Sequence, residues 1–170
     1  MMSPWLRNGS EKREPPVIFV EINEEFQESI PGNLIQQAAQ QTLQLNKLEE
    51  SPSLSIKIST DQEIRQLNAT YRGLDKVTDV LSFTADYIDP DLETRYLGDV
   101  VISFPRAARQ AEQRGHSPQA EVQLLVVHGV LHLLGFDHDT FEAKRDMWGI
   151  QERIMQALGL NIQVEDEDTF

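Results

Sequence analysis

The sequence predicts an α+β fold, mixed in the manner of α/β proteins, with a central mixed sheet of about four strands packed by about five helices. Short strand-like runs and longer segments with helical periodicity alternate along the chain, and several helices come at its end. Residues 122–134 are apolar nearly all round, which is typical of a central buried helix. The length of 170 residues suits one domain with a substantial core.

The first half of the chain supplies two strands and two helices. Residues 17–22 form an apolar run, and residues 53–59 alternate apolar and polar side chains as a half-buried strand does. Between these strands, a Pro-Gly pair precedes apolar side chains at helical spacing. Residues 60–63, Thr-Asp-Gln-Glu, form a capping box that opens a short helix.

The second half begins with a hairpin and ends in helices. Residues 79–83 and 97–103 are expected to be strands joined by the polar, turn-rich segment 84–95. A proline near the start of each of the next two helices, 105–114 and 118–134, suits the first helical turn. The last helix is expected to begin after a capping threonine at 140 and to stop at a glycine at 159.

The chain is acidic and contains no cysteine. Its 15 Lys and Arg against 28 Asp and Glu give a net charge of −13, which argues against a broad basic face for nucleic acid or anionic membrane. The missing cysteines exclude a disulfide scaffold, an iron–sulfur cluster and a thiol nucleophile. No stretch has the length of a membrane span or signal peptide, so a cytoplasmic protein is expected. Residues 15–160 are expected to form the single domain, between a disordered arm (1–14) and a disordered acidic tail (161–170).

Three histidines, His128, His132 and His138, have the spacing H-x-x-x-H-x-x-G-x-x-H. On a helix the first two share one face, with about 5–6 Å between Cβ atoms, so both can reach a metal at about 2.0–2.1 Å. Gly135 can adopt a positive φ and end the helix, which brings His138 back as a third ligand. Three nitrogens and an open position predict one catalytic Zn²⁺ per chain, whose bound water has a pKa of about 7. Nickel and copper also suit such ligands.

This segment has other interpretations besides a catalytic metal site. Two uncoordinated imidazoles in an apolar helix would need hydrogen-bond partners to offset their burial. Metzincin proteases share the spacing but carry a general-base Glu where this chain has Gly129, so the sequence disfavours a zinc metallopeptidase. Asp137 could be a base, a partner that fixes an imidazole tautomer, or a loop cap. His116, just before a helix, is expected to be an ordinary surface residue.

A second segment places two cations in the short loop between a helix and a strand. Arg72 ends the helix with Gly73, and Lys76 follows in the loop. The planar fork of an arginine suits phosphate. The alternative is a solvated turn in which these cations pair with Asp75 or Asp79. The loop becomes part of a site only if the fold brings Arg72 to the metal.

Together these segments resemble the YbeY family of bacterial rRNA maturation endoribonucleases. Residues 128–138 match the family signature H-G-x-L-H-L-x-G-x-D-H at every fixed position, and residues 71–83 match Y-R-x-x-D-x-x-T-D-V-L-S-F. Residues 97–103 match the family's L-G-D-[IV]-x-I-S strand, and the resemblance runs from about residue 17 to 160. One departure is Thr84, where a proline usually stands.

The resemblance implies a zinc-dependent endoribonuclease of single-stranded RNA, with the three histidines as ligands and Arg72 on the substrate phosphate. It also implies rRNA processing at the 3′ end of the small-subunit rRNA, ribosome quality control, and links to the small ribosomal subunit and an Era-type GTPase. The main alternative is a non-enzymatic ribosome assembly factor whose zinc is structural, which needs a fourth protein ligand. Residues 101–160 carry a charge of only −1, so a small cationic cleft in an acidic body is expected.

Overall fold

The computed structural model describes residues 14–48 and 50–162, and in them it shows the mixed four-stranded sheet that the sequence predicts. Three strands are parallel, and the last pair is antiparallel. The strands lie in the order β1-β2-β4-β3 and comprise β1 (Val17–Ile22), β2 (Ser53–Ser59), β3 (Val80–Asp89) and β4 (Thr94–Ser103). β3 is therefore an edge strand, and its first residues are the end of the second sequence motif, 71–83.

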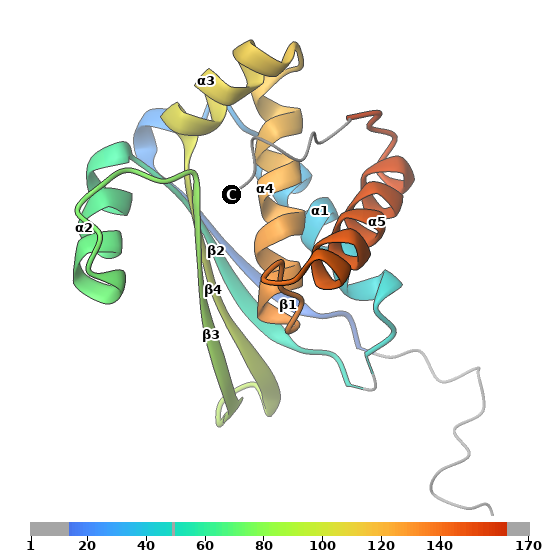
Figure 1. Ribbon diagram of the computed structural model, residues 1–170. Helices are drawn as coiled ribbons and strands as arrows, with labels where there is room; N and C mark the ends of the chain where they lie inside the picture. Colours follow the sequence, from blue (N-terminus) through green and yellow to red (C-terminus); the bar gives the residue numbers. More distant parts are fainter. Residues whose placement is uncertain (1–13, 49, 163–170) are drawn as a thin grey trace, which may run out of the picture.

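Five α-helices surround this sheet (Figure 1), together with a short 3-10 turn, Glu24–Phe26. The α-helices are α1 (Gly32–Leu45), α2 (Asp61–Arg72), α3 (Phe104–Arg114), α4 (Pro118–Leu133) and α5 (Phe141–Ala157). α1, α4 and α5 lie on one face of the sheet, α2 lies on the other face, and α3 lies at one end. α4 packs against α1, α3, α5, β3 and β4, so it is the central helix.

Local sequence explains where the helices begin. The side-chain oxygens of Thr60, Ser117 and Thr140 each accept a hydrogen bond, of 3.1 Å, from the backbone N–H three residues on. These caps satisfy N–H groups that a helix leaves open at its start. α4 is buried on all sides between residues 120 and 131, as its apolar sequence predicts. A polar side chain on α4 is therefore held in a fixed position by the packed residues around the helix.

The hairpin differs from its prediction. β3 and β4 run on to Asp89 and Thr94, so that only residues 90–93 connect them, rather than the whole of 84–95. Cross-strand contacts extend the pairing: the rings of Tyr87 and Tyr96 lie 5.3 Å apart, and Arg95 pairs with Asp86 at 2.9 Å. Such cross-strand pairs stabilise strand pairing in a segment whose polar composition is typical of a loop.

The expected arm and acidic tail fall mostly on residues 1–13 and 163–170, which lie outside the described residues. In the part of the chain that is described, no helix combines the length and the apolar character that crossing a bilayer requires.

Candidate metal centre

His128 and His132 lie one turn apart near the end of α4, on one face, as their spacing predicts. Their Nε2 atoms lie 3.0 Å apart, and their rings meet edge to face. His128 is buried, whereas His132 is partly exposed. The pair therefore points two ring nitrogens at one place that opens towards solvent.

The turn after α4 returns the third histidine to the same place. Gly135 has a φ of 98°, its N–H bonds to the carbonyl of His132, and the N–H of Phe136 bonds to the carbonyl of Leu131, both at 3.0 Å. This is the Schellman arrangement that glycine favours at a helix end. The ligand atoms of His128, His132 and His138 consequently all lie within 4.8 Å of one another. The predicted convergence of the three imidazoles is confirmed.

The surroundings keep the first two imidazoles neutral, which is the form that binds a metal. Burial lowers the pKa of His128 to about 3, and the charges of neighbouring histidines act in the same direction. Burial also lowers the pKa of His132. Three convergent imidazoles fit a zinc, nickel or copper ion by the chemistry of the donor set. Among residues 14–48 and 50–162, Asp137 and Asp139 group with His138 alone, and no carboxylate joins the three histidines.

The residues of the arginine loop open into the same hollow as the histidines. A cleft of about 680 Å³ lies between the loop after α2, the edge strand β3 and the turn after α4. The sequence-predicted site residues all line it: Arg72, Lys76, His128, His132, Asp137 and His138. The fold thus brings together two motifs that lie about fifty residues apart in the sequence.

Hydrogen bonds hold Arg72 beside α4, the helix that carries His128 and His132. Its Nη2 donates to the backbone carbonyl of Ser82 at 2.9 Å, and the hydroxyl of Ser82 donates to the carbonyl of Gly129 at 3.1 Å. Asp75 pairs with Arg65 (Nε–Oδ1, 2.8 Å). Within the described residues neither Arg72 nor Lys76 forms an ion pair, so the pairing with Asp75 or Asp79 that the alternative expected is not observed.

The structure gives a steric reason for a glycine at position 129. A Cβ at this position would lie 2.6 Å from Cγ1 of Val100 and 3.3 Å from the hydroxyl of Ser82. The helix therefore approaches the sheet closely between its two histidines. A glutamate at this position, which a metzincin-like reaction requires, has no room.

Asp137 caps the turn that carries His138. Its Oδ1 accepts a hydrogen bond from the backbone N–H of His138 at 2.7 Å. This bond and a second one with Asp139 lower the pKa of Asp137, and the bond with Asp137 raises the pKa of Asp139. Of the three roles considered, the loop cap is the one that the contacts display.

The expectation for His116 was wrong. Its side chain is only 16% exposed and pairs with the fully buried carboxylate of Glu121, to which Arg114 also donates at 2.7 Å. Burial raises the pKa of Glu121, and the hydrogen bond with His116 and the charge of Arg114 act against this shift. This cluster joins α3 to α4 and lies apart from the cleft. A pattern read along one chain could not show that α4 buries a glutamate.

Two neighbours of the histidines on α5 were also missed. Gln151 contacts Nδ1 of His128 at 3.1 Å through its Oε1 atom. The ring of Trp148 stands perpendicular to those of His128 and His138, with centroids 5.9 and 6.0 Å away. Both residues lie on the side of α5 that packs against α4, but neither residue type signalled a contact with histidine.

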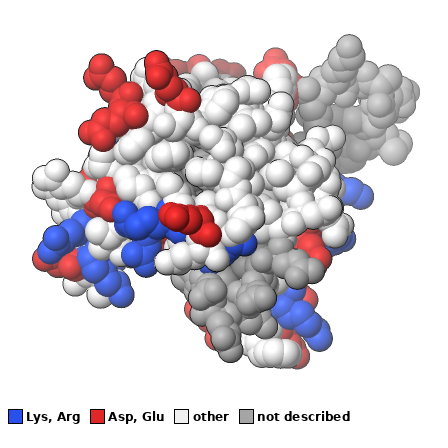
Figure 2. All heavy atoms as spheres, turned by 90° about the horizontal axis from the view of Figure 1, so that it is seen from above, with Lys and Arg blue, Asp and Glu red and all other residues white. Residues whose placement is uncertain are grey.

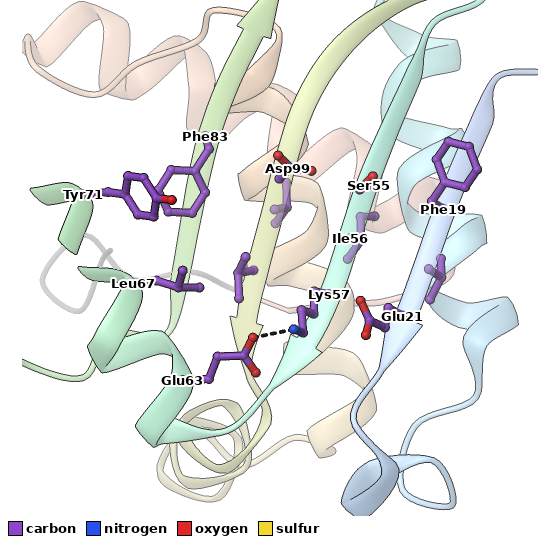
Figure 3. Close-up of a pocket in the computed structure, with 13 residues that line it drawn as sticks. Phe19, Glu21, Ser55, Ile56, Lys57, Glu63, Leu67, Tyr71, Phe83 and Asp99 are labelled. Carbon is purple, nitrogen blue, oxygen red and sulfur yellow. Dashed lines mark hydrogen bonds and ion pairs between the residues drawn. The ribbon is translucent and has the colours of Figure 1, made fainter. Parts of the chain in front are cut away.

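A second hollow, of about 570 Å³, lies on the other face of the sheet, beside α2 (Figure 3). Aromatic side chains from β1, α2 and β3 stand around it, at Phe19, Tyr71 and Phe83. Its charged lining is mainly acidic, with Glu21, Glu63 and Asp99 against Lys57, which pairs with Glu63. Formal charge does not separate the two hollows, because Asp79, Asp137 and Asp139 line the histidine cleft beside Arg72 and Lys76. The three convergent imidazoles distinguish the histidine cleft.

The surface charge is unevenly distributed. Seen from above, many of the Lys and Arg lie on the side where α2 lies, with some Asp and Glu among them, and others lie on the opposite side (Figure 2). Arg72 and Lys76 belong to the end of α2 and the loop after it. These two residues are the Lys and Arg that line the cleft among the described residues.

Comparison with known proteins decides the family. A family-wide sequence profile described as Endoribonuclease YbeY matches residues 19–159. The chain belongs to the endoribonuclease YbeY family. The family signature that the sequence resembles is the segment whose three histidines converge in the structure.

Individual relatives cover nearly the whole chain. An Endoribonuclease YbeY from Roseiflexus castenholzii is 40% identical over 150 residues, which is 85% of this chain and 94% of the relative. Another from Bacillus thuringiensis is 40% identical over 149 residues, 84% of this chain and 95% of the relative. The fold is also shared with a Thermotoga maritima protein solved in solution, with a TM-score of 0.54, 21% identity, and coverage of 84% and 92% of the two chains.

Proposed function

We propose that this protein is a zinc-dependent endoribonuclease that cleaves single-stranded RNA in the maturation of ribosomal RNA. Its family comprises RNA-cleaving hydrolases. The observation that carries the proposal is the single cleft that joins Arg72 and Lys76 to the three histidines. Cations that bind phosphate and nitrogens that bind a metal are the parts a phosphodiester hydrolase needs.

His128, His132 and His138 are the residues that would hold the metal. When bound, the metal supplies a Lewis acid for a scissile phosphate and lowers the pKa of a water molecule. The neutral imidazoles suit this role because burial lowers the pKa values of His128 and His132. Three protein ligands leave a coordination position open, as in catalytic sites.

Arg72 is the residue that would bind and orient the phosphate. One Nη atom is fixed on the carbonyl of Ser82, and the exposed side chain retains donors that can face the cleft. A guanidinium stabilises the charge that builds up on a phosphate during cleavage. Lys76, exposed on the same wall, would contact a neighbouring phosphate as a mobile point charge.

Asp137 would act mainly by shaping the turn rather than by taking a proton. Its lowered pKa makes it a weak base, and its Oδ1 is engaged by the backbone of His138. The reaction would then use the cleft's cations and metal more than a carboxylate base. Either water or the RNA 2′-hydroxyl can serve as the nucleophile in such a cleft.

The structural-zinc alternative requires a fourth protein ligand. In the described part of the chain the three histidines have no such partner among the carboxylates, which favours catalysis. The peptidase alternative is disfavoured because Gly129 leaves no space for a base on α4.

The biological role that we propose follows from the family. The protein would process the 3′ end of the small-subunit rRNA and take part in ribosome quality control in the cytoplasm, with the small ribosomal subunit and an Era-type GTPase as partners. The net charge of −13 supports a need for such partners, because an acidic body binds free RNA weakly.

The decisive experiment is cleavage of matched single-stranded and duplex RNA by the purified protein, with and without chelator. We expect metal-dependent cleavage of the single strand, and its loss in His132→Ala and Arg72→Glu proteins that remain folded. Arg65→Ala is the matched control, because Arg65 is an exposed cation on the same helix that pairs with Asp75 outside the cleft. Undiminished cleavage by metal-free His132→Ala protein would overturn the proposal.

A further inference from the structure

α5 forms the buried side of the histidine cluster. Gln151 is 1% exposed, and its Oε1 lies 3.1 Å from Nδ1 of His128. The opposite ring nitrogen of His128, Nε2, lies 3.0 Å from Nε2 of His132 and so faces the cluster. One imidazole therefore has one nitrogen against an amide of α5 and the other against its fellow ligands.

We infer that Gln151 is a positioning residue for the metal site, which accepts a hydrogen bond from Nδ1–H of His128 and thereby reserves Nε2 for the metal. The inference rests on the proposed metal binding. A neutral imidazole has one N–H and one lone pair, so a partner at one nitrogen decides which nitrogen can be a ligand. An acceptor at Nδ1 places the proton there and leaves the lone pair on Nε2.

The opposite orientation of the amide is incompatible with the cluster. If the amide nitrogen of Gln151 donated to Nδ1, the proton of His128 would move to Nε2 and point at the nitrogen of His132. That proton would occupy the position where a metal must bind. In the orientation observed, Oε1 faces Nδ1 and the amide Nε2 is buried without a hydrogen-bond partner among the described residues. Such a buried donor costs stability, which is consistent with a side chain kept for its oxygen.

The packing of α5 supports the same role. Trp148, three residues before Gln151, stands edge-on to His128 and to His138. Residues three apart on a helix face the same side, so one face of α5 contacts two of the three histidines. α5 also follows directly on the turn that carries His138. Its placement therefore fixes the cluster from the interior, opposite the cleft that contains Arg72.

The test compares two substitutions that differ in one property. Gln151→Met keeps the length of the side chain and removes the acceptor, whereas Gln151→Glu keeps an acceptor oxygen and removes the unpartnered donor. We expect Zn²⁺ affinity, measured by competition with a chromogenic chelator, to fall about 10- to 100-fold in Gln151→Met. Gln151→Glu should bind Zn²⁺ at least as tightly as the wild type. Ile154→Val, a buried change on the same helix, is the packing control and should leave affinity unchanged.

A second measurement needs no variant. In the metal-free wild-type protein, ¹⁵N chemical shifts should show His128 as the Nδ1–H tautomer. The inference would be overturned by an Nε2–H tautomer of His128. It would also be overturned if Gln151→Met had the Zn²⁺ affinity of the wild type, or if Gln151→Met and Gln151→Glu lost Zn²⁺ affinity equally. If the wild-type protein itself binds no Zn²⁺, the proposed function fails first. Wild-type binding with an unaffected Gln151→Met protein refutes the role of Gln151 alone.

Discussion

Replacing Gly129 by alanine tests whether α4 lies as close to the sheet as the site requires. The new Cβ would lie 2.6 and 3.1 Å from the two methyl carbons of Val100. Carbon atoms normally approach to about 3.5–4.0 Å, so the nearer contact overlaps by about 1 Å. A β-branched side chain in a strand cannot easily turn away. Overpacking of this kind costs about 1–3 kcal/mol.

A second glycine on a helix isolates this cost. Gly149 lies on α5 with nothing within 4 Å of its hypothetical Cβ. Alanine should stabilise the protein there by about 0.8–1.0 kcal/mol, because alanine is the better helix former. The same gain applies at Gly129 but is opposed by the overlap. We therefore expect Gly129→Ala to be less stable than Gly149→Ala by about 1–3 kcal/mol, or about 2–12 °C in Tm at 2–4 °C per kcal/mol.

The assay is chemical and thermal unfolding of both variants, followed by circular dichroism in excess chelator so that metal binding does not contribute. Val100→Ala supplies the second arm, because it should relieve the overlap and make the two changes non-additive by about 0.5–3 kcal/mol. Equal stabilisation by alanine at Gly129 and Gly149 would refute the close approach, and with it the steric explanation for the missing glutamate.

Three further predictions concern single side chains around the cleft. Arg72→Ala should lower kcat/KM for single-stranded RNA about 10- to 100-fold, equivalent to a charged hydrogen bond of about 1.5–3 kcal/mol, with Zn²⁺ affinity unchanged; a loss matched by Arg65→Ala would point to general charge instead. Burial raises the pKa of Asp79, so its carboxyl group keeps a proton in the native state at a pH where the unfolded state has lost it. The protonated carboxyl therefore contributes to the free energy of unfolding at low pH, and this contribution is lost as pH rises through the raised pKa. Urea unfolding between pH 4 and 8 should therefore favour Asp79→Asn over the wild type increasingly with pH, and a constant difference would contradict this. Asp137→Asn should retain most RNA cleavage, because an amide oxygen can accept the same bond from His138; loss of activity in a folded, metal-binding protein would restore Asp137 as the base.

The fold and the histidine cluster could be predicted because local rules decide them. The caps at Thr60 and Thr140 and the positive φ of Gly135 are properties of short segments, and the structure confirms them. The spacing of His128 and His132 on a helix places both on one face whatever surrounds them. These features need only neighbours in the sequence.

The features that were missed depend on contacts between distant segments. Gln151 could not be singled out, because nothing near it in the sequence shows that it meets His128, 23 positions away. His116 was taken for a surface residue, although tertiary packing places it against the buried Glu121. The hairpin was predicted too short because strand pairing, rather than composition, orders residues 84–89. Gly129 could be noticed but not explained until Val100 was placed beside it.

The most direct test of the account is stoichiometric reconstitution. The purified protein is stripped of metal, shown to remain folded by circular dichroism, and titrated with Zn²⁺ while cleavage of a single-stranded RNA is followed. The account predicts no cleavage by the stripped protein, a linear recovery that ends at one Zn²⁺ per chain, and no recovery in His132→Ala. Full cleavage by the stripped, folded protein, or equal recovery in His132→Ala, would contradict the claim that the three histidines and their metal form the active site.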